Sequence, residues 1–254
     1  MFVKALAGSS LVRILSMLFS FGVGVQLARG LGVRGYGYYG LALSIITMAG
    51  IPGELGLSRL VAREVAIASA HNEKAAVGGV IRWSARTCWL LSAIVSAAIA
   101  IAGVILVLRG SPILGAAVLL GIPTIPLLAL SRIYGGALQG LHFITLGQMP
   151  ANVIRPLFLS VLLFGALLVG AMTPPVAMAL SSVTAGLVYL IARAWLNDRH
   201  SAPASGGFVA TPRAWLASTI PLALTDGMRT LQLELTAVLL GALTIPSEVG
   251  LFRV

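Results

Sequence analysis

Several ionisable side chains lie within or beside long apolar stretches of this sequence. A charge at the centre of a membrane helix costs roughly 2.5–3.5 kcal/mol. Seven of them facing lipid would cost on the order of 20 kcal/mol, so we expect them to face a bundle interior or a watery cavity. In such a cavity an arginine can bind a phosphate group, and an acidic side chain can bind a cation or take up a proton. The seven are Arg13, Glu54, Arg132, Arg155, Asp226, Arg229 and Glu234.

Catalytic constellations do not accompany these charges. The sequence contains no His-Glu-x-x-His and no Gly-x-Ser-x-Gly, and its three histidines, His71, His142 and His200, are far apart. Cys88 is the only cysteine. We therefore expect a protein that is not an enzyme and that holds no cofactor or metal; a coupling cation, H+ or Na+, is left open.

Polar residues recur at helical spacing around these charges, so four helices are each expected to turn a polar face toward a common centre. The stripes are Ser9, Arg13, Ser16 and Ser20; Ser44, Thr47, Glu54 and Ser58; Gln148, Asn152 and Arg155; and Thr225, Arg229, Gln232 and Thr236 with Asp226 and Glu234 beside them. The candidate substrate-binding residues are Arg13, Glu54, Asn152, Arg155, Asp226, Arg229 and Gln232.

Simpler interpretations stand beside this one. Stripes of Ser and Thr also serve helix packing, Arg13 can snorkel to the headgroups, and Arg132 can mark a helix end. Asp226 and Arg229 are three residues apart and can neutralise each other. Glu54 has only Arg59 near it in sequence, so we expect a partner on another helix or a titrating role.

The composition indicates what kind of structural element carries these residues. Of 254 residues, 58% are hydrophobic and only 9% are charged, whereas soluble domains carry roughly 25% charged residues. This excludes a soluble enzyme and a disordered chain, and it predicts an all-α, polytopic transmembrane bundle. The net charge of +10 does not indicate nucleic-acid binding, because the basic residues are scattered among apolar runs.

Seven stretches are long and apolar enough to span a bilayer. They are 9–30, 38–58, 86–108, 113–139, 147–170, 174–196 and 214–243. The charges in 59–85 suggest that the second helix continues into the cytosol. Prolines within or near the spans predict kinks around the polar centre, although no single one is assigned as a hinge. These are Pro52, Pro123, Pro126, Pro156 and Pro221.

The basic residues orient the bundle, because cytoplasmic loops are rich in Lys and Arg. With a cytoplasmic N-terminus, the outside carries only Arg29, Arg34 and Arg109. The inside then carries Lys4, Arg13, Arg59, Arg63, Lys74, Arg82, Arg86, Arg132, Arg193, Arg199 and Arg213. We expect this orientation.

The chain divides after its sixth span. Residues 197–213 are rich in Pro, Ser and Gly and are typical of a linker. The start of the seventh span can be laid on the first, with Leu11 on Leu224 and Gly37 on Gly250. We expect a six-span lobe over 1–196, a cytoplasmic linker over 197–213, and the first helix of a second, truncated lobe over 214–254.

Three segments carry a family resemblance. Residues 27–66 resemble the first loop and second helix of Wzx-type polysaccharide-unit flippases, in the superfamily that also holds the multidrug exporters called MATE. Residues 130–159, with a Gly-Gln pair followed by a proline, resemble the fourth-to-fifth helix segment, and 218–254 resemble the seventh helix.

The resemblance implies two lobes around an alternating-access cavity in the bacterial inner membrane. It implies a cargo of oligosaccharide on undecaprenyl pyrophosphate, moved from the cytoplasmic to the periplasmic leaflet. Membrane lipids, polysaccharide polymerases and glycosyltransferases are the other expected partners. The positions carried over are Arg13, Glu54, Arg59, Arg155, Asp226 and Arg229.

Two competing functions are weaker. A MATE-like, cation-coupled exporter of drugs or metabolites would need acidic groups in its first lobe, where Glu54 is the only acid well inside the spans. A membrane enzyme of the same pathway would need a large external loop, and the expected external loops are short.

Overall fold

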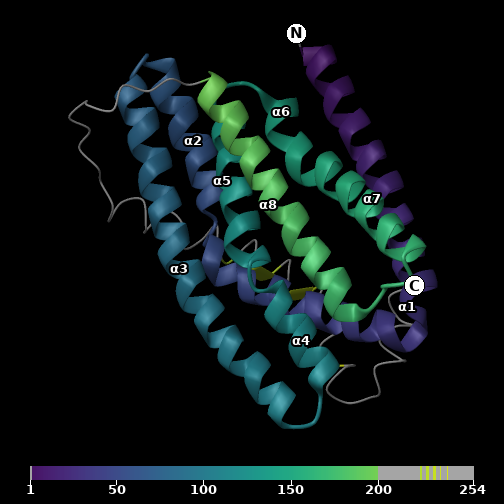
Figure 1. The fold of residues 1–254 in the computed structure, drawn as a ribbon. Coiled ribbons are helices and arrows are strands. Elements are labelled where there is room, and N and C mark those ends of the chain that lie inside the picture. Colours follow the sequence, from purple (N-terminus) through teal and green to yellow (C-terminus); the bar gives the residue numbers. More distant parts are fainter. Residues whose placement is uncertain are drawn as a thin grey trace.

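The computed structural model describes residues 2–199, with side chains from Ser10 onward, and seven single positions beyond. Those positions are Leu224, Gly227, Met228, Leu231, Gln232, Leu235 and Leu239. Within this part of the chain every element is a helix (Figure 1). The elements are α1 (Phe2–Glu54), α2 (Leu57–Ala70), α3 (Lys74–Leu108), α4 (Pro112–Gly121), α5 (Thr124–Gly140), α6 (Ile144–Met149), the π-helical turn η1 (Pro150–Ile154), α7 (Arg155–Leu168) and α8 (Pro174–Arg199).

Five uninterrupted or nearly uninterrupted helical segments are long and apolar enough to cross a membrane among the described residues. They are Ser10–Ala70, Lys74–Leu108, Pro112–Gly140, Ile144–Leu168 and Pro174–Arg199. The expected fold class, a polytopic helical bundle, is confirmed. The predicted span 214–243 lies outside the described residues except at single positions. The predicted linker 197–213 lies outside them from residue 200 onward, and its first three residues belong to α8.

The first of these segments contains two of the predicted spans. We expected helices over 9–30 and 38–58 with a loop between them, but α1 runs through the first span and most of the second, to Glu54, and leaves helical geometry only at Gly32. Gly32 has φ 63° and ψ 174°, which a residue with a Cβ rarely adopts. Figure 1 shows the sharp turn, after which α1 crosses toward α2. The chain therefore changes direction at a single glycine, where a loop was expected.

The second predicted span, 38–58, is interrupted near its end, and the helix then continues beyond the span as expected. Leu55 and Gly56 have φ of 44° and 65°, and α2 begins at the next residue. A turn over 71–73 then leads directly into α3, which starts twelve residues before the predicted 86.

Prolines divide two further spans. Pro123 lies between α4 and α5, so the predicted span 113–139 consists of two helices. The predicted span 147–170 contains α6, η1 and α7, with prolines at positions 150 and 156. These positions agree with the expectation of kinks, since proline cannot donate the backbone bond that keeps a helix regular.

Helix α5 is the central packing element and lies between α2 and α8 (Figure 1). Glycines permit its close approach to neighbours. A Cβ on Gly136 would collide with the carbonyl oxygen of Ser58, and one on Gly140 would lie 2.7 Å from the carbonyl oxygen of Ala62. Small residues allow membrane helices to pack backbone to backbone in this way. Helices α2 and α5 are thus held as one unit.

Buried apolar side chains form two clusters. One joins α2, α3, α5 and α8 and includes Leu60, Leu130 and Leu138; the other joins α1, α4, α7 and α8 and includes Leu163 and Met178. Large apolar side chains such as Leu90 and Ile94 of α3 point outward instead. An exposed apolar face of this kind suits contact with lipid.

Candidate functional site

A cavity of about 730 Å³ lies between α1, α5, η1 and α7. Its polar lining comes from elements far apart in sequence: both halves of α1, the α5 helix and the η1–α7 junction. The polar and charged side chains that line it are Ser16, Ser20, Tyr39, Thr47, Glu54, Thr124, Arg132, Asn152 and Arg155. Residues from three of the expected polar stripes therefore meet around one space, and α5 adds a fourth wall.

Arg155, the first residue of α7, carries the least compensated charge in this lining. Its Nη2 donates a hydrogen bond to the Ser181 hydroxyl of α8, 3.2 Å away. Its Nε is covered from solvent and has no hydrogen-bond partner among the described residues. No described carboxylate forms an ion pair with it. Buried polar groups are nearly always paired, so this guanidinium lacks part of its usual set of partners.

Local backbone geometry brings Arg155 and Asn152 to the cavity together. The backbone N–H of Arg155 donates to the carbonyl of Pro150, five residues earlier, which defines the wide π-helical turn. Pro156 has no N–H to offer to Asn152, so the regular pattern cannot resume before α7. Single π-helical turns of this kind occur frequently at functional sites.

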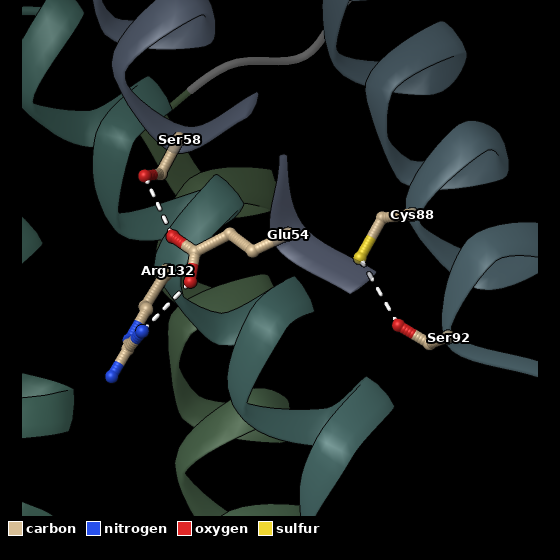
Figure 2. Close-up of polar contacts among 5 residues, drawn as sticks. All are labelled: Glu54, Ser58, Cys88, Ser92 and Arg132. Carbon is tan, nitrogen blue, oxygen red and sulfur yellow. Dashed lines mark hydrogen bonds and ion pairs between the residues drawn. The ribbon is translucent and has the colours of Figure 1, made fainter. Parts of the chain in front are cut away.

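Glu54 faces Arg132 across the same cavity. The Arg132 Nη1 lies 2.7 Å from the Glu54 Oε2, and the Ser58 hydroxyl donates to Oε1 at 2.8 Å (Figure 2). The partner expected for Glu54 on another helix is therefore Arg132 of α5. The Cys88 thiol lies 3.8 Å from the Ser92 hydroxyl within α3. Figure 2 shows this contact apart from the Glu54–Arg132 pair.

A second cavity, of about 610 Å³, adjoins the first. It is lined by Arg13, Ser10, Ser16 and other residues of α1, and by Gln148 and Asn152 across from them. Ser16 and Asn152 line both cavities, so the two spaces meet there. Arg13 is exposed and faces this second space rather than the cavity of Arg155.

The remaining candidates are less well placed. Gln232 is exposed and lines neither cavity. Asp226 and Arg229 lie outside the described residues, but Gly227 between them lines the first cavity beside Ile51 of α1. Arg59 is exposed on α2 and is absent from both linings.

Sequence reasoning missed two side chains that matter here. Tyr39 lines the cavity from α1. It lies five residues before Ser44, so the three- and four-residue spacing of the stripe does not reach it. Ser181 contacts Arg155 from α8. No spacing rule predicts that contact, because it depends on how α8 is rotated against α7.

Comparison with known proteins adds one match. The model of a family described as polysaccharide biosynthesis protein matches residues 2–254. No significant match was found among curated proteins or among solved structures.

Proposed function

The chain belongs to the polysaccharide biosynthesis protein family, and from that premise we propose that it is a flippase for oligosaccharide units carried on undecaprenyl pyrophosphate. The proposed transport runs from the cytoplasmic to the periplasmic leaflet of the bacterial inner membrane. The cavity between α1, α5 and α7 would receive the anionic part of the cargo and expose it to each side in turn by alternating access.

One observation carries this proposal: Arg155 is held in a cavity within the membrane-spanning helices without a carboxylate partner among the described residues. A buried charge without its counter-charge is costly. A phosphate group is a suitable counter-charge, because the planar guanidinium can bind two of its oxygens at once.

The charges around the cavity favour an anion over a cation. Its described lining contains two arginines, Arg132 and Arg155, and one acid, Glu54, which gives a net charge of +1. The acid is already engaged by Arg132 and Ser58. A cation-coupled exporter would need that carboxylate for its ion, so the flippase is the better supported function.

The first test removes the Arg155 guanidinium in the full-length protein. We expect Arg155→Ala to lower surface polysaccharide at least about tenfold, since truncating one partner of a buried charged contact costs several kcal/mol. Arg155→Lys should keep part of the activity, because it retains the charge but loses the two-pronged geometry. Polysaccharide is measured in cells whose own copy of the gene is deleted.

Arg109→Ala is the matched control, because Arg109 is exposed after α3 and lines neither cavity. It should leave polysaccharide at the wild-type amount. Wild-type amounts of polysaccharide in the Arg155→Ala strain, at equal protein level, would refute the role of Arg155.

The proposal includes an orientation and a division of the chain. The N-terminus is cytoplasmic, residues 1–196 form one lobe, 197–213 form a cytoplasmic linker, and the segment after it begins a second repeat. The orientation is supported by the excess of Lys and Arg on one side. The division is supported by the composition of the linker and by the likeness of the first and seventh spans.

Cysteine labelling tests the orientation. Glu73 and Arg109 are exposed at opposite ends of α3. In a Cys88→Ser background, a membrane-impermeant maleimide added to intact spheroplasts should label Arg109→Cys and spare Glu73→Cys, and permeabilised cells should label both. The reverse pattern would invert the proposed topology.

A further inference from the structure

Glu54 occupies the point where the backbone of the second span is broken. It is the last residue of α1, and Pro52 two residues earlier cannot donate a helical hydrogen bond. Leu55 and Gly56 follow with positive φ before α2 resumes. Side chains other than glycine rarely adopt the φ of 44° found at Leu55. Pro52 and Gly56 favour a break here, but the conformation of Leu55 is locally unfavourable, so contacts around the break must stabilise it.

The Glu54 carboxylate provides such contacts to two other helices. One oxygen accepts from the Ser58 hydroxyl of α2, and the other pairs with Arg132 of α5 (Figure 2). Because α2 and α5 pack backbone to backbone at Gly136 and Gly140, both partners belong to one unit. The end of α1 is thus fastened to the α2–α5 unit through one side chain.

Arg132 and Arg155 both line the first cavity. The side chain of Arg132 is 55% exposed, whereas that of Glu54 is 16% exposed. An anion in this cavity therefore meets the guanidinium before it meets the carboxylate. Such an anion can form an ion pair with Arg132, as the Glu54 carboxylate does. A pyrophosphate carries more negative charge than one carboxylate.

We propose that Glu54 is a positioning residue that forms an anion-sensing latch with Arg132. Without cargo, the pair fixes the end of α1 to α5. When a pyrophosphate binds between Arg132 and Arg155, it takes Arg132 from Glu54 and frees the end of α1 to move. This inference rests on the proposed function. In it, Glu54 and the pyrophosphate of the cargo compete for Arg132.

Equilibrium binding of inorganic pyrophosphate to the purified full-length protein tests the latch. Glu54→Gln should tighten binding on the order of fivefold or more, a typical size for coupling between two sites, because Arg132 no longer has to leave a carboxylate. Glu64→Gln is the matched control, since Glu64 also pairs with an arginine, Arg63, but lies outside both cavities. It should bind as the wild type does.

Losing a negative charge near the cavity would by itself favour an anion, so a double-mutant cycle separates the two effects. Arg132→Gln should weaken binding, and adding Glu54→Gln to it should tighten binding clearly less than Glu54→Gln does in the wild-type background. Tightening by Glu54→Gln of the same size in both backgrounds would overturn the latch and leave simple charge repulsion. No tightening by Glu54→Gln in the wild-type background would overturn it as well.

Two further arms keep the latch distinct from the proposed function. Loss of pyrophosphate binding in Arg155→Ala together with an unchanged affinity in Glu54→Gln removes the latch and leaves the cationic cavity standing. No binding to the wild type removes both. Phosphatidylglycerol added to the titration should compete poorly; equal competition would assign the site to a bilayer headgroup and overturn the pyrophosphate assignment.

Discussion

At the scale of single residues, the account depends on how arginine behaves away from water. Its guanidinium stays charged and demands partners along its whole edge. Arg155 donates a hydrogen bond to the Ser181 hydroxyl, and its covered Nε has no partner among the described residues. Arg132 has its charge met by Glu54. Of the two arginines in this cavity, Arg132 thus has a carboxylate partner and Arg155 has none among the described residues. A bound anion would give Arg155 a negatively charged partner as well.

The sequence predicted part of this site. Helical spacing identified Glu54, Asn152 and Arg155 as residues that face a shared interior, and the structure places all three on one cavity. It could not identify Arg132 as the partner of Glu54, because that contact depends on the rotation of α5 against α1. The separate placement of Arg13 in the second cavity also depends on the crossing of α1 and α6, which no pattern within one helix encodes.

At the scale of elements, both the helices and the interruptions within them determine where the cavity-lining residues lie. The apolar runs predicted the three spans 113–139, 147–170 and 174–196 to within a few residues, because hydropathy is the strongest signal in a membrane chain. The single-residue break at Gly32 and the π-helical turn at Pro150–Ile154 were not predicted. Glycine and proline are common in membrane helices that remain regular, so their presence alone does not show where a helix changes geometry.

The close packing of α2 on α5 gives a prediction at this scale. Gly136→Ala and Gly140→Ala should each lower the free energy of unfolding by about 1–3 kcal/mol, the usual cost of overpacking, because the new Cβ meets a backbone carbonyl oxygen of α2. Thermal unfolding of the purified protein in detergent measures the effect.

Gly165 of α7 supplies the control for that prediction, since a Cβ there meets nothing within 4 Å. Gly165→Ala should leave the melting temperature unchanged or raise it slightly, because alanine is favoured over glycine inside a helix by about 0.5–1 kcal/mol. Equal melting temperatures for all three variants would show that α2 and α5 do not form the tight unit described above.

At the scale of the whole molecule, the described helices form a bundle that is apolar outside and polar at two joined cavities. Outward-facing side chains such as Leu90, Ile94 and Leu108 match a lipid environment. The cavities meet at Ser16 and Asn152. Together they provide a polar path along one face of the first half of α1, from Ser10 to Ser20, that a head group with several anionic and hydroxyl groups could follow.

Movement of a defined cargo by the purified protein is the most direct test of the central claim, that the Arg155 cavity carries an anionic, lipid-linked oligosaccharide. The full-length protein is reconstituted in vesicles whose undecaprenyl-pyrophosphate-linked oligosaccharide is initially inaccessible to an added glycosidase, and cleavage is followed over time. The account predicts that the wild type and Arg109→Ala expose the cargo at similar rates and that Arg155→Ala is slower by about tenfold or more. Equal rates for Arg155→Ala and the wild type would contradict it.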